Sequence, residues 1–489
     1  MIVKVIPSRA VHTRCPYVLS LAALGIPILG LEFLLGQVER RGAVRALAAA
    51  HPRAWGIGAC SLWAIFLINA YYNVLMAYAW LYLAHSFTRP LPWGDDIHSS
   101  AAFFYGPEIV NRAKPVSPPW SPGTTGLGQV QWRLVLATAA QWALTALCTL
   151  RGFKTTGAVV LATVPLPAVM LVILVAHGCT RRGSELGVDV YVNPSGAVYA
   201  NGELWKEAAG QIFFTLGIGG GIMIAYGSGQ PRHRPTVANT WTVALCNSGF
   251  SIIAGFAVFS YLGHFAHESG QSMDAIAAEA GGIGLSFIVF PAVLATLPAS
   301  NFFSVVFFLM LVTLGLDSAM SMVEAIATSI KDRSAWAHEH PERTTLVVCT
   351  VGLAVSLIMT TRGGLDVLSV IDYHTANYGL VLAGLLETAA VGWLYPVRRL
   401  AARAEALTGE PAWWLPVAWP MCVRFITPLL LAALLAANLR EETVRVGLYG
   451  SQPAWVVATF GWALSVGGCV ALVLTGLATP VETQERSVD

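Results

Sequence analysis

A run of glycines inside a strongly apolar segment is the first feature that suggests chemistry. The segment is QIFFTLGIGGGIMIAYGS, residues 211–228, and its glycines are Gly217, Gly219, Gly220 and Gly221. Each glycine in a helix interior costs about 1 kcal/mol relative to alanine, so the segment is predicted to unwind there. Unwound backbone inside a bilayer is tolerated where it is buried in protein or lines a watery cavity, and its carbonyl groups can then hold a cation. The alternative is a close helix–helix contact through small residues.

Polar side chains at helical spacing flank this run. Gln211 and Thr215 are four residues apart and share one helix face, and so do Asn247 and Ser251 in the next apolar segment. Polar faces on consecutive buried helices predict a shared polar site. The alternative is that these groups hold the two helices together by hydrogen bonds, worth about 0.6 kcal/mol each.

A single carboxylate marks a third segment. Asp317 lies in TLGLDS, residues 313–318, inside an apolar run with no cationic side chain within several residues. A carboxylate at membrane depth is a functional candidate by default. A bound cation is its natural partner together with the Ser318 hydroxyl, because hard cations prefer oxygen ligands.

Composition limits the class of protein. The chain has 489 residues, of which 55% are hydrophobic and 11% charged, whereas soluble domains carry about 25% charged residues. The sequence therefore predicts an all-α polytopic membrane protein. The net charge of +2 gives no indication of nucleic-acid binding, and the eight scattered cysteines form no CxxC motif. No arrangement typical of an enzyme's catalytic residues stands out, so we expect no enzymatic activity and no covalent cofactor.

Apolar runs of about 20 residues predict the membrane spans. A further stretch, residues 282–299, contains Pro291 and Pro298; we interpret it as an amphipathic re-entrant segment or lid rather than a span. Eleven spans are predicted, near residues 16–37, 55–87, 131–150, 155–177, 205–228, 238–264, 301–330, 344–361, 367–396, 416–438 and 453–477.

The distribution of arginine and lysine predicts the orientation, because cytoplasmic loops are enriched in these residues. The basic loops alternate along the chain, beginning with residues 40–53 after the first span and including residues 398–403 after the ninth. This pattern places the C-terminus in the cytoplasm and, with eleven spans, the N-terminus outside. We expect an integral multi-pass protein of the plasma membrane, in contact with the lipid bilayer.

Several segments resemble the neurotransmitter:sodium symporter family, which shares the bacterial leucine transporter fold. The resemblance runs from about Pro16 to the last span. GIPILGLEFLLGQ (25–37) is similar to the family's second helix, FLINAYYNVLMAYAWLYL (66–83) to its third, QIFFTLGIGGG to its sixth and IDYHTANYGLVLAGLLETAAVGWLY (371–395) to its tenth. The resemblance implies a single transporter domain built as an inverted-repeat bundle, with an outer loop at 88–130, an outer lid at 267–300 and a cytoplasmic tail at 478–489.

The sequence departs from the family at its start. The family has twelve helices with both termini inside, and the eleven spans here match helices two to twelve. The family's first helix, which supplies sodium and substrate ligands, is not found in the sequence. We expect either that the gene model begins late or that the chain is a degenerate relative.

The resemblance implies roles for individual residues. A first sodium ion would be held by Thr215 and Asn247, and a second by the Leu314 carbonyl, Asp317 and Ser318. Asp372 corresponds to the acid of the outer gate; without an arginine partner it is expected to be a solvated carboxylate. Glu32 is expected to hydrogen-bond helix ends. The chloride site would comprise Tyr17, Gln211, Thr215, Asn247 and Ser251, and the substrate pocket Ile68, Tyr72, Phe214, Gly217, Gly220, Ser318 and Met322.

These roles imply a sodium-coupled, chloride-dependent symporter of a neutral amino acid or related amine. Many family members carry an aromatic residue where Gly220 stands, so glycine is expected to enlarge the pocket and favour a bulky substrate. The alternative at this position is that Met322 or another residue fills the space. The alternative is a pseudo-transporter that does not transport and acts as a membrane scaffold or regulator. An oligomer is compatible with either.

Overall fold

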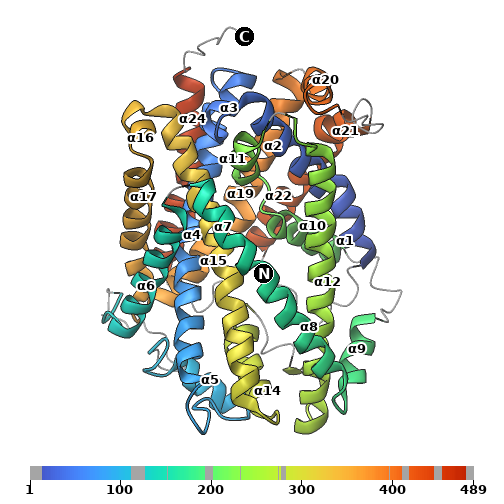
Figure 1. The fold of residues 1–489 in the computed structure, drawn as a ribbon, viewed down its shortest axis with the longest axis vertical. Helices are drawn as coiled ribbons and strands as arrows, with labels where there is room; N and C mark the ends of the chain where they lie inside the picture. Colours follow the sequence, from blue (N-terminus) through green and yellow to red (C-terminus); the bar gives the residue numbers. More distant parts are fainter. Residues whose placement is uncertain are drawn as a thin grey trace.

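The protein is a bundle of helices that run roughly parallel to one long axis (Figure 1). The computed structural model describes residues 14–480, apart from 112–126, 151, 193–201, 232, 274, 277–281, 396, 410–417 and 445–453. No β-strand occurs in this part of the chain, where a single β-bridge joins Val130 to Thr361. The prediction of an all-α polytopic membrane protein is confirmed, because nine described helical segments are long and apolar enough to cross a bilayer.

The helices of the first half are as follows. The first apolar segment comprises α1 (Arg14–Ser20), η3 (Leu21–Gly25) and α2 (Ile26–Glu39), and it is followed by α3 (Ala43–Ala50), α4 (Trp55–His85), α5 (Ile97–Tyr105), α6 (Trp132–Thr149), α7 (Phe153–Thr163), α8 (Pro165–Cys179), α9 (Ser184–Val192), α10 (Gly202–Thr215), α11 (Ile222–Gly229) and α12 (Thr236–Ser269).

The second half contains the remaining helices. Here short π-helical or 3₁₀ turns interrupt several spans: η5 (Leu285–Val289), α14 (Phe290–Ala295), α15 (Ser300–Arg333), α16 (Ala335–Glu339), α17 (Pro341–Ser356), η6 (Leu357–Thr360), α18 (Gly364–His374), η7 (Thr375–Gly379), α19 (Leu380–Ala389), η8 (Ala390–Leu394), α20 (Val397–Thr408), α21 (Ala418–Met421), η9 (Cys422–Ile426), α22 (Thr427–Val444), α23 (Ala454–Val456), η10 (Val457–Gly467) and α24 (Gly468–Ala478).

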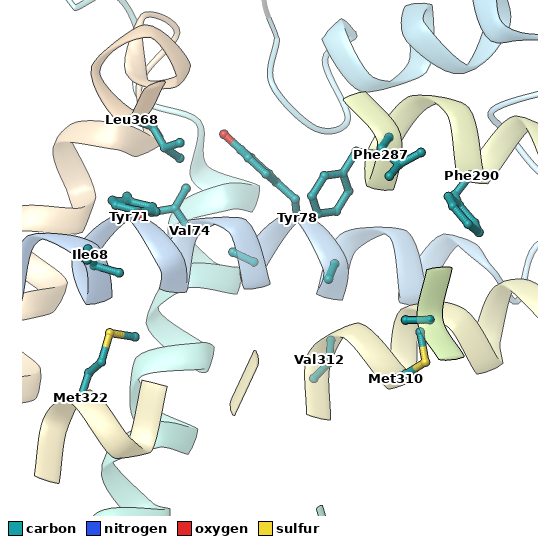
Figure 2. Close-up of a cluster of buried hydrophobic side chains, with 14 of the residues drawn as sticks. Ile68, Tyr71, Val74, Tyr78, Phe287, Phe290, Met310, Val312, Met322 and Leu368 are labelled. Carbon is teal, nitrogen blue, oxygen red and sulfur yellow. The ribbon is translucent and has the colours of Figure 1, made fainter. Parts of the chain in front are cut away.

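The two long helices α4 and α15 form the centre of the bundle and pack against each other. Their side chains share one continuous core with η5, α14 and α18, part of which is shown in Figure 2. Near one end, the Tyr82 ring stacks on Phe308 at 4.8 Å between centroids, and its hydroxyl donates a hydrogen bond to the Phe287 carbonyl at 2.6 Å. Helices α8, α12 and α22 instead expose many large apolar side chains, as expected of surfaces that face lipid.

Two predicted spans are absent from the nine for different physical reasons. The predicted span 205–228 is divided into α10 and α11, so neither piece alone is long enough to cross. The predicted span 131–150 is the helix α6, which carries Arg133, Gln141 and several threonines and is therefore less apolar than the others.

The interpretation of residues 282–299 as amphipathic is wrong. Residues 285–294 are buried on all sides in η5 and α14, and they pack against α5 and α15. Ser100 on α5 donates a hydrogen bond to the Ile288 carbonyl at 2.7 Å. The segment is a short core helix at the end of the bundle, and its 11 residues, Leu285–Ala295, are too few to span.

Glycines set the distance between α2 and α11. A Cβ atom at Gly36 would lie 2.1 Å from the Ile224 carbonyl oxygen, and one at Gly227 would lie 2.5 Å from the Phe33 carbonyl oxygen. Both close approaches are to backbone atoms, which cannot rotate away as a side chain would. The two helices therefore touch backbone to backbone, the arrangement that small residues permit between helices in membranes.

We expect Gly36→Ala to lower the stability of the folded protein by about 1–3 kcal/mol, because the new methyl group forces α2 and α11 apart. Thermal unfolding in detergent, followed by loss of the monodisperse chromatographic peak, measures the effect. The matched control is Gly157→Ala in α7, where nothing lies within 4 Å of the added Cβ. It should leave stability unchanged or raise it by up to about 1 kcal/mol. Equal melting temperatures for the two variants would contradict the close contact.

Candidate functional site

The predicted unwinding of the glycine run is confirmed. Helix α10 ends at Thr215 and α11 begins at Ile222. Between them the backbone adopts positive φ angles of 63° at Gly217, 77° at Gly219 and 72° at Gly221. Glycine reaches this left-handed region without the strain that a side chain imposes. The glycines are therefore needed by the conformation, and the break leaves backbone groups without helical partners.

Glu32 supplies the missing partners for two of these groups. Its side chain on α2 is fully buried; one carboxylate oxygen accepts a hydrogen bond from the Gly219 amide at 2.5 Å, and the other accepts one from the Met223 amide at 3.2 Å. A negative charge at the first turn of α11 is also favoured by the helix dipole. The expectation that Glu32 hydrogen-bonds helix ends is confirmed.

A second carboxyl group lies near the first. Glu387 on α19 is fully buried, and Glu32 is its electrostatic neighbour. Within the described residues neither of its carboxyl oxygens has a hydrogen-bond partner. The two glutamates thus differ: Glu32 is held by backbone amides and Glu387 is not.

The structure brings two of the expected sodium ligands together at the end of α10. The Asn247 side-chain amide on α12 donates a hydrogen bond to the Thr215 hydroxyl at 3.3 Å. The Ser251 hydroxyl instead donates to the Asn247 carbonyl at 2.9 Å, so it is engaged by its own helix. Gln211 lies half-buried one turn before Thr215 on α10, which packs against α1.

Tyr17 on α1 contacts α12 at Ser248, a residue that was not among the expected ligands. Its hydroxyl donates a hydrogen bond to the Ser248 hydroxyl at 3.3 Å, and Ser248 is nearly buried. Ser248 directly follows Asn247 but lies off the face shared by Asn247 and Ser251, which is why helical spacing did not select it. Ser248 adds a hydroxyl group to this polar cluster.

The carboxylate of Asp317 is held by a residue from a distant segment. The Thr163 hydroxyl, at the end of α7, donates a hydrogen bond to one oxygen of Asp317 at 2.5 Å. The helix is interrupted after Thr163, just before Pro165, which starts α8. Asp317 is half-buried and has no salt bridge to a basic side chain among the described residues. No sequence signal pairs Thr163 with Asp317.

The other two expected ligands of the second sodium ion lie on the same turn of α15. Ser318 is exposed, and its hydroxyl donates a hydrogen bond to the Leu314 carbonyl at 3.4 Å. Asp317, Ser318 and the Leu314 carbonyl therefore offer three oxygen-bearing groups within about one helical turn. This oxygen-only set is the kind that a hard cation binds.

The residues expected to line a pocket come from α4, α15 and the helix break. Ile68 and Met322 are buried in the core, and their side chains point toward each other across the gap between α4 and α15 (Figure 2). Tyr72, one turn along α4 from Ile68, has Ser318 of α15 as a polar neighbour. Phe214 is half-buried against the same core at the end of α10, next to the break that contains Gly217.

The expectation that Gly220 enlarges the pocket is wrong. A Cβ atom at Gly220 would lie 2.6 Å from the Ile65 side chain and 3.7 Å from that of Leu380. The space beside this glycine is thus already filled by Ile65. The absence of a side chain at position 220 is no argument for a bulky substrate.

The expectation that Asp372 is a solvated carboxylate is also wrong. The hydroxyl of Tyr71, which is buried on α4, donates a hydrogen bond to one oxygen of Asp372 at 2.6 Å. Asp372 itself is half-buried on α18. Tyr71, which directly precedes Tyr72 in α4, therefore ties α4 to α18 through this carboxylate.

We expect Glu32→Gln to destabilise the fold by about 1.5–3 kcal/mol. Both amides at the break would lose a charged acceptor, and one of them would face the NH₂ group of the glutamine instead of an oxygen. Thermal unfolding of the purified protein measures the loss.

Glu387→Gln is the matched control. It removes a neighbouring carboxyl group that accepts no hydrogen bond among the described residues, so it should change the melting temperature less than Glu32→Gln. A larger loss for Glu387→Gln would contradict the role assigned to Glu32.

Comparison with known proteins identifies the family. The profile of the sodium:neurotransmitter symporter family matches residues 14–483. The sodium- and chloride-dependent GABA transporter 2 of Rattus norvegicus is 32% identical over 479 residues, covering 94% of this chain and 79% of that protein. The sodium-dependent dopamine transporter of Bos taurus is 31% identical, covering 92% and 67%. The sodium- and chloride-dependent neutral and basic amino acid transporter B(0+) of Mus musculus is 30% identical, covering 92% and 77%. The chain, an integral membrane protein with a helix broken between α10 and α11, belongs to the sodium:neurotransmitter symporter family.

Proposed function

We propose that this protein is a sodium-coupled, chloride-dependent symporter of a neutral amino acid or a related amine, working by alternating access. The observation that carries the proposal is the helix break at residues 216–221, which lies beside the Thr215–Asn247 pair. Broken helices of this kind form ion and substrate sites in secondary transporters, since their backbone groups are free to bind. The relatives named above, transporters of GABA, dopamine and amino acids, support the same substrate class.

Two cation sites are proposed. One uses the side-chain oxygens of Thr215 and Asn247 at the break, and the other uses the Leu314 carbonyl, Asp317 and Ser318 on α15. Inward movement of one positive charge across 100 mV releases about 2.3 kcal/mol, so two sodium ions can drive a steep substrate gradient.

The chloride site is proposed at the junction of α1, α10 and α12. Hydroxyl and amide groups can donate hydrogen bonds to a desolvated anion. The negative charge of the anion offsets the positive charge of nearby cations. Tyr17 and Asn247 are already engaged there, with Ser248 and Thr215 respectively. The proposed ligands are Tyr17, Gln211, Thr215, Asn247 and Ser251.

The substrate is proposed to bind between α4, α15 and the break, where Tyr72 would donate a hydrogen bond to a carboxylate and Phe214 would cover the pocket. Asp372, held by Tyr71, is proposed as the acid of the outer gate. The remaining pocket residues are Ile68, Gly217, Gly220, Ser318 and Met322.

We propose that the protein lies in the plasma membrane with its C-terminal side in the cytoplasm. The basic segment that includes Arg40, Arg41 and Arg45 follows α2, and α3 and α20 lie at the same end of the bundle as the end of α24 (Figure 1). The Trp55 indole also donates a hydrogen bond to the Thr479 carbonyl at 2.7 Å, which ties the start of α4 to this end. An excess of basic residues marks the cytoplasmic side.

We expect the purified protein in proteoliposomes to take up a labelled neutral amino acid or amine when an inward sodium gradient is applied, and to take up less when chloride is replaced by gluconate. Asp317→Asn should abolish sodium-dependent uptake because it removes the charged ligand. The control is Asp95→Asn, an exposed acid in the loop after α4, which should transport normally.

Each arm of this experiment tests a different part of the proposal. An uptake rate that is the same with and without a sodium gradient, for every substrate tested, contradicts symport. An uptake rate that does not change when gluconate replaces chloride contradicts only the proposed anion site.

We expect Thr163→Val to lower the sodium concentration for half-maximal uptake, by up to about fivefold for a hydrogen bond worth about 1 kcal/mol. The reason is that the Thr163 hydroxyl occupies an oxygen of Asp317 that a cation would use. Thr163→Ser keeps the hydroxyl and should behave as the wild type. A rise in the half-maximal concentration for Thr163→Val would show that the hydroxyl assists sodium binding, contrary to this expectation.

A further inference from the structure

The short helix α20 has two different faces. It follows the span that ends at Leu394, and its buried residues Val397, Leu400 and Ala401 are spaced three and four apart and pack in a cluster with α2. Arg398, Arg399 and Arg403 are exposed. An amphipathic helix of this composition is docked across the end of the bundle beside α2 and α21 (Figure 1).

The exposed face of α20 carries unbalanced positive charge. Within the described residues, Arg398 and Arg399 have no hydrogen-bond or ion-pair partner. Arg403 lies 4.0 Å from Glu39 and donates a hydrogen bond to the Tyr395 hydroxyl at 3.4 Å, yet its side chain remains 60% exposed. The exposed acid on this helix is Glu405. Three arginines therefore face solvent with one acid among them.

The residues next to α20 resemble those at a bilayer interface. Trp393 and Leu394, which end the preceding span, are 57% and 58% exposed. The Arg424 guanidinium lies 4.7 Å from the Trp393 ring centroid and 5.5 Å from that of Phe425. The level where lipid headgroups begin is typically marked by aromatic rings at the edge of the apolar layer. An arginine there often extends its side chain along such rings. Because α20 starts three residues after Leu394, its arginines lie close to the same level.

We propose that Arg398, Arg399, Arg403 and Arg424, here called the α20 basic surface, bind the headgroups of acidic phospholipids. Guanidinium groups pair with phosphate oxygens through two parallel hydrogen bonds. Each basic residue near an anionic membrane surface strengthens binding by about fivefold. A lipid can in addition lay its acyl chains against Trp393 and Leu394, which a free phosphate cannot do. The surface is distinct from the proposed transport site.

Lipid binding to the purified full-length protein tests this inference. Native mass spectrometry in detergent would compare phosphatidylserine with phosphatidylcholine of the same acyl chains, and phosphatidylserine should bind more tightly. The double variant Arg398→Gln/Arg399→Gln should lower phosphatidylserine affinity by about 25-fold, the product of two fivefold effects, and leave phosphatidylcholine binding unchanged. Both arginines are exposed, so the variant should fold, and its melting temperature checks this.

Arg182→Gln is the matched control, because Arg182 is an exposed arginine that follows α8 in the loop before α9. It should leave phosphatidylserine binding unchanged. Unchanged affinity in the double variant, or an equal loss in Arg182→Gln, would overturn the proposal. Displacement of the lipid by an excess of inorganic phosphate would overturn the assignment to lipid. The measurement requires no transport, so its result stands apart from the uptake experiment.

Discussion

Backbone amides that lose their helical partners inside a bilayer must be given others, and in this protein Glu32 provides them. The break between α10 and α11 depends on this fully buried carboxylate, which accepts hydrogen bonds from Gly219 and Met223. Without such an acceptor, open backbone at this depth would be left unsatisfied. Glycine makes the conformation accessible, and the carboxylate makes it stable. The open conformation between Thr215 and Ile222 follows from these two conditions together.

The packing around the break also stabilises its open backbone. The backbones of α2 and α11 touch at Gly36 and Gly227, so Glu32 on α2 is held at a constant distance from the amides it serves. The long helices α4 and α15 contribute aromatic and aliphatic side chains to one continuous buried core. Tyr72 on α4 and Ser318 on α15 are polar residues on these two helices.

The sequence predicted the features that depend on local pattern. The helical class, most of the spans, the break at the glycines and the role of Glu32 follow from hydropathy, glycine propensity and the family's motifs. The sequence did not predict the pairs that depend on tertiary approach. Thr163 and Asp317 are 154 residues apart, Tyr17 and Ser248 are 231 apart, and Tyr71 and Asp372 are 301 apart. The space at Gly220 was misjudged for the same reason, because Ile65 comes from another helix.

The hydrogen bonds at the end of α2 connect two parts of the molecule that otherwise look unrelated. Glu39 accepts a hydrogen bond from the Tyr395 hydroxyl at 2.9 Å and lies near Arg403 of α20. Two helical turns back along α2 is Glu32, which holds the break. Helix α2 therefore contacts the Tyr395–Arg403 region at its last residue, Glu39, and holds the helix break through Glu32 near its middle. A displacement of α2 caused at α20 would therefore also move Glu32 relative to the backbone amides of α11.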